Sequence, residues 1–176
     1  MELVFLCPRL TCHRFFIARY TYSPLKEYIL ENCVPFEPIQ HEFSDHIETI
    51  SSRFCRIFNE SGNAELQGWK LVAGPGYRKA LEFLIKDYIS GLRPTDAEVI
   101  AHTQLGPCIN NYVTNDNVKT TAERAAWIGN DETHYARRWE DKDLDDLKTL
   151  IELTVHWIEM EIMTKKMLGD MPQGKK

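Results

Sequence analysis

Apolar side chains recur at a helical period over most of the chain beyond residue 40. The segment "GPGYRKALEFLIKDYISGLRP" shows this pattern most clearly. Its apolar positions lie three and four residues apart, at Tyr77, Ala80, Leu81, Leu84, Ile85 and Tyr88. Gly74, Pro75 and Gly76 predict the turn that opens this helix, and Gly91 with Pro94 predicts its end.

Two further stretches carry the same period. In "FSDHIETISSRFCRIFNESGNAELQGW" the apolar positions are Ile47, Ile50, Phe54, Ile57 and Phe58. Ser51 and Ser52 are candidates to cap a second helix within that stretch. Over 143–168 the residues that follow the helical period are Leu144, Leu147, Ile151, Thr154, Ile158 and Ile162. Shorter pieces between these stretches break at Gly106 and Pro107 and at 114–117, which predicts roughly five to seven helices in all.

The first 35 residues follow a different pattern. Aromatic and β-branched residues favour strands over 3–6 and 15–22, and "CPRLTCH" between them is typical of a turn. The stretch "SPLKEYILENCVPFEP" predicts a short helix or an irregular connection. The predicted fold class is therefore mainly α, with a small β-hairpin over 1–35, a helical bundle over 36–168 and a flexible tail that starts at Gly169.

Composition and charge narrow the function classes. The chain of 176 residues has a formal net charge of −5, which argues against a general nucleic-acid binder but leaves room for a local basic patch. Apolar runs stay shorter than the ~18 residues that a membrane span needs. The N-terminus "MELVFLCPRL" shows neither a basic leader nor a long apolar segment. We therefore expect a cytoplasmic protein that does not enter a membrane.

Cysteine usage leaves two interpretations of the hairpin turn. The five cysteines are an odd number, which argues against a disulfide framework. Cys7 and Cys12 resemble half of a zinc ribbon, but a structural zinc needs four ligands. Cys7, Cys12 and His13 would supply two or three of them, and Cys33 or His41 would have to complete the site. The sequence favours two unliganded cysteines and no cofactor over a structural zinc.

Three blocks, in order, resemble a known family. They are "LVFLCPRLTCHRFFIARY", "GPGYRKALEFLIKDY" and "AAWIGNDETHYARRW". Together they are similar to the prokaryotic family called domain of unknown function 4145, over roughly residues 3 to 168. That family is grouped with the HEPN superfamily, and its members stand alone or join restriction-type and other defence proteins.

The resemblance implies an antiparallel HEPN-like helical bundle in a cytoplasmic bacterial protein. Superfamily members commonly form homodimers, and the active ones are metal-independent ribonucleases. In these, an Arg holds the scissile phosphate, and a His several residues further on supports proton transfer.

The chain departs from that nuclease pattern. Arg124 lies ten positions before His134, and Gly129 stands where the pattern has its Arg. Asn130 and His134 remain four residues apart, on one face if the segment is helical. The missing cation would have to come from Arg124, Arg137 or Arg138.

Asn130 and His134 therefore have two interpretations. They are either an acid–base pair beside a cation or a polar lock that fixes a helix junction, and the missing Arg favours the lock. Gly129 fits a close approach of two helices, and Tyr135 belongs to the same signature. The segment "HYARRW" mixes cations with aromatic rings, which suits RNA contact but is also typical of a bundle edge.

The segment "GPGYRK" also has two interpretations. A glycine-rich turn at a helix start can bind an anion, but no complete nucleotide motif is present, so the sequence favours a plain helix start. The signature residues of this segment are Gly76, Tyr77, Arg78, Lys79 and Glu82. Arg78, Glu82 and Lys86 lie four residues apart and are expected to pair. Arg78 and Glu82 also lie within expected reach of the polar cluster around His134.

The last helix has a second apolar side, at Trp157, Met160, Met163 and Met167. Burial on two sides predicts a homodimer. The functional hypothesis is a non-catalytic binding or dimerisation module of a defence or RNA-related system, with a protein or RNA as partner. Two alternatives remain open. One is a metal-independent ribonuclease that uses Asn130, His134 and a nearby Arg, and the other is a zinc-stabilised adaptor.

Overall fold

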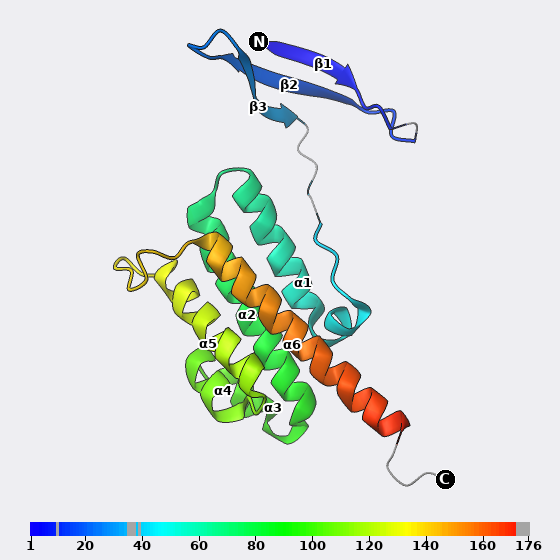
Figure 1. The fold of residues 1–176 in the computed structure, drawn as a ribbon, viewed down its shortest axis with the longest axis vertical. Helices are drawn as coiled ribbons and strands as arrows, with labels where there is room; N and C mark the ends of the chain where they lie inside the picture. The colour runs from blue at the N-terminus through cyan, green and yellow to red at the C-terminus, as the bar shows by residue number, and fades with distance from the viewer. Residues whose placement is uncertain (10, 35–37, 39, 172–176) are drawn as a thin grey trace. The chain divides into compact units, whose positions relative to one another are not determined.

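The computed structural model describes residues 1–9, 11–34, 38 and 40–171, which form two compact units, Met1–Ile39 and Gln40–Lys176. The described part of the first unit is a three-stranded antiparallel sheet, and that of the second is helical (Figure 1). The prediction of a mainly α protein with a small N-terminal β element is confirmed.

The helices of the second unit are α1 (Asp45–Leu66), α2 (Lys70–Leu92), α3 (Ala97–His102), α4 (Leu105–Tyr112), α5 (Asp116–Asp131) and α6 (Leu144–Asp170), with a short 3-10 helix at Pro94–Asp96. The four long helices α1, α2, α5 and α6 lie side by side and alternate in direction (Figure 1). The short helices α3 and α4 lie at one end of this bundle.

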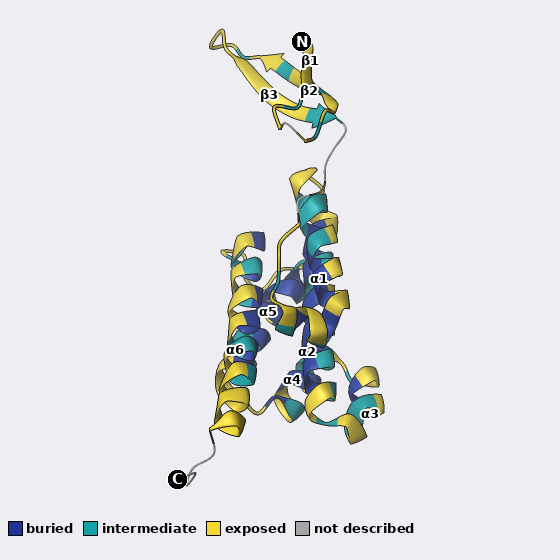
Figure 2. Ribbon diagram, turned by 90° about the vertical axis from the view of Figure 1, so that its right-hand side faces the viewer, coloured by how far each residue is buried: buried dark blue, intermediate teal, exposed yellow. Residues whose placement is uncertain are grey.

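Helices α1, α2 and α6 turn their predicted apolar faces into the bundle (Figure 2). The whole predicted stripe of α2 is buried, and so are Ile47, Phe54 and Phe58 of α1. On α6, Leu147, Ile151 and Thr154 are fully buried. The helical period of the sequence therefore identified the core correctly.

Helix α1 contains the second cap that the sequence predicted. Ser51 leaves helical geometry, at φ −153° and ψ 80°, and kinks the helix. Its hydroxyl oxygen accepts a hydrogen bond from Phe54 N at 3.2 Å and donates one to Asp87 on α2. The cap therefore starts a new helical segment and also ties α1 to α2.

Helix α2 corrects one prediction. It begins at Lys70, so Pro75 lies inside the helix and the neighbouring glycines form no opening turn. The turn lies earlier, at Gly68, whose φ of +80° favours glycine. The absence of a helix start at "GPGYRK" also removes the basis for an anion site there.

Gly74 and Gly76 serve helix packing instead. A Cβ at Gly76 would lie 2.3 Å from Ser61 Oγ of α1, and a Cβ at Gly74 would lie 2.6 Å from Glu132 Oε2. Both distances are far below van der Waals contact, so only a hydrogen fits. The glycines let α2 approach its neighbours closely.

The sheet corrects a second prediction. Strands β1 (Glu2–Leu6) and β2 (Phe15–Tyr22) form the predicted hairpin, but β3 (Tyr28–Val34) adds a third antiparallel strand. A tight turn makes this possible, since Ser23 N donates to Glu27 O and Lys26 N donates to Ser23 O. A helical or irregular connection is therefore wrong for this segment.

Two helix ends also differ from the predicted positions. Gly106 and Pro107 lie in the first turn of α4 and do not break it. Helix α6 continues through Gly169 to Asp170, so the helix does not end where the tail was predicted to begin. The rest of that tail, residues 172–176, lies outside the described residues.

Candidate functional site

The candidate site lies where α5 ends and the loop 132–143 begins. Helix α5 is capped at its start by Asn115, whose side-chain oxygen accepts from Asn117 N and Val118 N. At its end, the Thr133 amide and hydroxyl both donate to Asn130 O, at 2.9 and 2.8 Å. The polar side chain thus competes with helix continuation, and the chain leaves the helix before residue 134.

Asp131 holds the loop in place. It is only 6% exposed, and its Oδ2 accepts from the backbone nitrogens of Arg138 at 2.9 Å and Trp139 at 2.7 Å. Bonds to a carboxylate are stronger than those between neutral groups. One buried side chain therefore folds the loop back onto the helix that it leaves.

This fold-back stacks two tryptophans. The rings of Trp127 on α5 and Trp139 on the loop are 6.0 Å apart and parallel to within 4°. Both remain more than two-fifths exposed. The Arg124 guanidinium carbon lies 5.8 Å from the Trp127 ring centre, in a cation–π position. The site therefore presents an aromatic platform on its surface.

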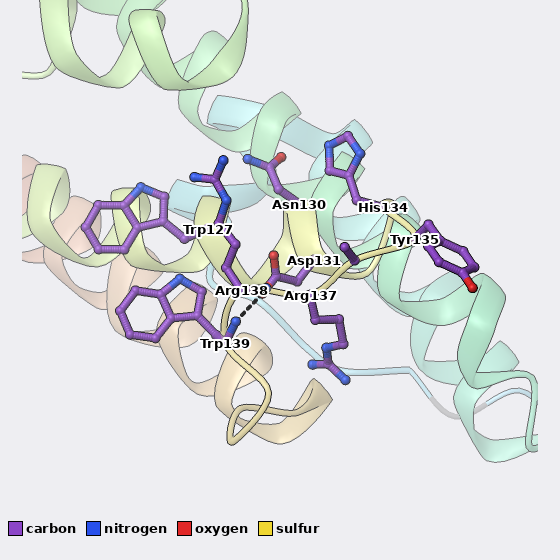
Figure 3. Close-up of a pocket in the computed structure, with 9 residues that line it drawn as sticks. Trp127, Asn130, Asp131, His134, Tyr135, Arg137, Arg138 and Trp139 are labelled. Atoms are coloured by element: carbon purple, nitrogen blue, oxygen red, sulfur yellow. Dashed lines mark hydrogen bonds between the residues drawn. The ribbon is translucent and has the colours of Figure 1, made fainter.

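An open pocket of about 760 Å³ adjoins this platform. It is lined by Trp127, Asn130, Asp131 and residues 134–139 (Figure 3). In Figure 3, Asn130 and His134 point to the same side, and the Arg138 side chain extends toward Trp127 and Asn130. Arg137 points the other way, and Tyr135 turns outward.

A polar network joins the pocket residue Asn130 to α2. Arg78 Nε donates to Asn130 Oδ1 at 3.0 Å, and Arg78 Nη1 donates to Glu82 Oε2 at 2.8 Å. Lys86 Nζ pairs with Glu82 Oε1 at 2.7 Å. The predicted Arg78, Glu82 and Lys86 pairing is confirmed, and so is the reach of Arg78 into the polar cluster.

The network shifts the protonation of Glu82. Burial opposes ionisation of this carboxyl group, but the hydrogen bonds and charges of Lys86 and Arg78 outweigh burial and hold the pKa of Glu82 below its ordinary value. Glu82 is therefore an ionised anchor for two cations of α2.

Gly129 brings the two helices together at this network. A Cβ there would lie 2.7 Å from Arg78 Cγ and 2.8 Å from Arg78 Cβ. The predicted close approach at Gly129 is therefore confirmed, between α5 and α2.

Asn130 and His134 do not share a helix face, because α5 ends at Asp131 and the condition of a helical segment is not met. His134 lies beyond α5, is exposed, and its amide bonds to the backbone oxygen of Asn130 at 3.1 Å. The Asn130 side-chain oxygen is taken by Arg78. The two residues share the pocket but do not form a buried lock.

The candidate cations occupy different environments. Arg124 donates to Thr120 O and covers Trp127, while Arg137 pairs with Glu132 at 3.0 Å and donates to Lys142 O. Within the described residues, the Arg138 guanidinium has no hydrogen-bond or ion-pair partner. Arg138 is therefore the cation that is free for a ligand.

The remaining signature residues have structural or surface positions. Tyr77 is buried and donates to Glu65 Oε2 at 2.8 Å, and both burial and Glu65 raise its pKa. Lys148 of α6 binds the other Glu65 oxygen at 3.0 Å. Lys79 is exposed, and Tyr135 is fully exposed. Tyr77 therefore joins α1 to α2, and its partner Glu65 extends the link to α6.

The structure does not bring metal ligands together around Cys7 and Cys12. Both are free and half-buried, and the described residues contain no group of three or more side chains able to hold a metal. Cys7 directly follows β1, whose last residue pairs with Phe15 of β2. Cys33 on β3 pairs with Ala18, which lies three residues further along β2. At about 3.3 Å a residue, that offset alone is about 10 Å.

Sequence reasoning missed the two central features of the site. The buried Asp131 and the stack of Trp127 on Trp139 both depend on the loop folding back, which no periodicity reveals. An aromatic residue on each side of a polar, cation-rich segment was the available signal.

Comparisons with family models, with curated proteins and with solved structures find no match for this chain. Among the residues that the structure describes, no helix combines the length and the apolar character needed to cross a membrane.

Proposed function

We propose that the helical unit is a non-catalytic binding module and that the pocket beside Trp127 and Trp139 is its ligand site. One observation carries this proposal: the exposed indole of Trp127 on α5 lies beside the exposed indole of Trp139 in the loop that the buried Asp131 holds. The same loop carries Arg138, whose guanidinium has no partner among the described residues. Exposed aromatic rings with convergent polar groups are typical of binding sites. A loop that hydrogen bonds already hold in place loses less entropy on binding than a free loop would.

The three sequence blocks resemble the HEPN-like family of domain of unknown function 4145, and we base the wider proposal on this resemblance. On that basis we propose a cytoplasmic prokaryotic protein that works in a defence or RNA-related system, without a cofactor. The alternation of long helices supports the comparison with an antiparallel bundle.

The contacts of Asn130 and His134 support binding rather than catalysis. A catalytic His is normally oriented by a hydrogen-bond partner on its second ring nitrogen. Within the described residues the His134 ring has no such partner, and Asn130 is engaged by Arg78. The pair therefore lacks the support that an acid–base site requires.

A metal-independent ribonuclease is the second candidate, because His134 and the free Arg138 line the same pocket. Such an enzyme would hold a phosphate on Arg138 and move a proton through His134. His134 is exposed, so its side chain does not stabilise the fold as a buried hydrogen-bonding residue would.

The test begins with purified protein and single-stranded RNA in EDTA. We expect no cleavage from the wild type or from His134→Ala, and we expect both to melt within about 0.5 kcal/mol of each other, as surface substitutions usually do. Cleavage that His134→Ala abolishes without a change in melting would establish the ribonuclease instead.

The same preparations then test the pocket as a ligand site. A mononucleotide, single-stranded RNA and an acidic peptide are each added, and the melting temperature is followed in the wild type and in Trp139→Ala. Binding to the folded state raises the melting temperature. The proposal requires that at least one ligand class stabilises the wild type and that Trp139→Ala removes this effect. Stabilisation that persists in Trp139→Ala, or none from any class, would contradict it.

We also propose that α6 pairs with a second copy of the chain. The exposed apolar side chains of its distal half are Met160, Met163, Met167 and Leu168. The three methionines follow the spacing i, i+3 and i+7, which places them on one face. The pairing would bury this face.

A further inference from the structure

We infer that the groove between α1 and α2 binds an acidic amphipathic helix of a partner protein. The groove has a volume of about 470 Å³ and is lined by residues of α1 from Arg53 to Ala64 and of α2 from Val72 to Phe83. It shares no described lining residue with the pocket at the end of α5. The inference therefore adds a second binding surface to the helical unit and does not depend on the proposed ligand site.

The groove has the length of a short helix. Its lining residues extend over about three helical turns on each wall, which is roughly 16 Å. The two walls run antiparallel. At one end, the Arg53 guanidinium carbon lies 5.7 Å from the Phe83 ring centre. At the other end is the turn between α1 and α2, where Trp69 N donates to Ala64 O at 2.9 Å. About three turns of a third helix therefore fit between the walls.

The surface between the walls is largely apolar. Ile57, Ala64 and Phe83 are half-buried there, and Val72 is 64% exposed. Ser61 is nearly buried, and its hydroxyl donates to Ile57 O at 2.7 Å, so its proton is not available to a ligand. The groove therefore leaves apolar surface in contact with water, and apolar side chains of a partner would cover it.

Helical walls favour a helix over an extended peptide as the occupant. The backbone N–H and C=O groups of α1 and α2 bond within each helix, so neither wall offers the main-chain partners that an added strand needs. A helix satisfies its own backbone groups. It presents apolar side chains at i, i+3, i+4 and i+7 along one face, which suits a groove of this length.

The edges of the groove are positively charged. Arg53 and Arg56 lie on the α1 wall and Lys79 lies on the α2 wall, and all three are exposed. Glu60 is the only acid among the described lining residues, and it pairs with Arg56 at 3.2 Å. Within the described part of the chain, neither Arg53 nor Lys79 has an ion-pair partner.

This charge selects the partner. The chain has a net charge of −5, yet each wall of the groove carries a cation, Arg53 or Lys79, that no acid neutralises among the described residues. Acidic residues on both sides of an apolar stripe are complementary to such a groove. A nucleic acid is less suited to it, because Phe83, the only ring among the described lining residues, is already covered by Arg53.

Fluorescence anisotropy of the full chain with a labelled peptide of about 15 residues tests the inference. The glutamate peptide has leucines at i, i+3, i+4 and i+7, glutamates beside this stripe and alanines elsewhere, so that it forms a helix. One comparison peptide has the same composition in scrambled order, and another has lysine in place of each glutamate. The glutamate peptide should bind at least about tenfold more tightly than either.

Two substitutions separate the charge from the apolar contact. Lys79→Glu should weaken the glutamate peptide about tenfold and strengthen the lysine peptide, because the reversed charge repels one and attracts the other. Val72→Asp should weaken both peptides, because it places a charge on the apolar surface. Both residues are exposed, so the melting temperatures of these variants should match that of the wild type.

Lys166→Glu is the matched control for charge. Lys166 is an exposed lysine of α6 without an ion-pair partner among the described residues, and its substitution should leave the glutamate peptide bound as in the wild type. Trp139→Ala should also bind this peptide like the wild type. The leucine stripe distinguishes the glutamate peptide from the acidic peptide that tests the pocket, so the two surfaces are tested separately.

Four results would overturn the inference. The first is that the wild type binds the glutamate peptide no better than the scrambled one. The second is that Lys79→Glu binds the glutamate peptide as tightly as the wild type does. Single-stranded RNA that binds the wild type but not Lys79→Glu, without any peptide binding, would assign the groove to a nucleic acid. Self-association that Val72→Asp abolishes in light scattering would assign it to a second copy of the chain.

Discussion

Gly129 lets Arg78 reach Asn130. Its single hydrogen leaves room for the Arg78 side chain, whose Cγ would lie 2.7 Å from any Cβ placed there. That contact orients the Asn130 amide so that its NH2 group faces the pocket. A backbone position on α5 therefore determines which polar group a ligand meets.

Gly129→Ala should lower the free energy of unfolding by about 1–3 kcal/mol, because the added methyl group must displace Arg78. Chemical denaturation measures this. Gly91→Ala is the matched control: Gly91 lies in α2 with nothing within 4 Å of its Cβ position, so alanine should stabilise by up to about 1 kcal/mol. If the two variants were equally stable, the close contact would be irrelevant to folding.

The sequence predicted some contacts of individual residues but not others. A glycine beside polar side chains was sufficient to predict the close approach at Gly129. The partner of Asn130 could not be predicted, because the choice between His134 and Arg78 depends on where α5 ends. The helix ends there because the side chains of Thr133 and Asp131 form hydrogen bonds with backbone groups. The spacing of apolar residues does not reveal such bonds.

Helix α2 carries a row of charges four residues apart. Arg78, Glu82 and Lys86 form two ion pairs along one side of the helix, and Glu82 is the shared anion. The side chains of Arg78, Glu82 and Lys86 are less than one-third exposed, so water screens them less than a surface pair. The row therefore contributes to stability as well as to the geometry of the pocket.

Glu82→Gln should show this contribution through its dependence on pH. The pKa of Glu82 is lowered in the folded state, so its stabilising effect is complete above the ordinary carboxyl value of about 4.3 and is lost as pH falls through the lowered pKa. At neutral pH we expect the free energy of unfolding of the wild type to exceed that of Glu82→Gln by about 1 kcal/mol. The difference should shrink progressively below about pH 4.

Denaturation at several pH values measures the difference, with Glu140→Gln as the control. Glu140 is exposed, and within the described residues it has no ion-pair partner. Its substitution should change stability little at any of these pH values. A difference for Glu82→Gln that does not vary with pH would contradict the ionised role of Glu82.

At the scale of elements, periodicity predicted the helices well and their boundaries less well. The apolar stripe of α2 is buried as predicted, yet the helix begins at Lys70, because the glycines there meet other helices instead of forming a turn. Strand β3 was missed because its exposed side chains, such as Tyr28 and Ile29, follow no clear alternation. Both the start of α2 and the formation of β3 depend on packing partners that are distant in sequence.

At the scale of the whole molecule, the distal part of α6 carries a row of exposed methionines. A second copy of the chain packed along this face would bury them, and each buried side chain of this size contributes about 1.5–3 kcal/mol. The sequence already indicated two apolar sides on this helix. Which side faces the bundle became clear only from the packing of α5 against α6.

Light scattering at tens of micromolar should therefore give the mass of a dimer. Met163→Glu should raise the dissociation constant at least tenfold, because it places a charge inside the contact. Leu71→Glu is the control, since Leu71 is also apolar and is 91% exposed but lies on α2. A wild type that is monomeric at these concentrations would exclude this pairing.

The hydrogen bond from Trp139 to Asp131 spans only eight residues of chain. Loops of about ten residues close in roughly 10–100 ns, much faster than a domain folds. The aromatic platform can therefore form as soon as the last turn of α5 exists, without waiting for distant contacts. A segment that closes on itself in this way can change its sequence, and so its ligand, while the bundle beneath it keeps the same packing.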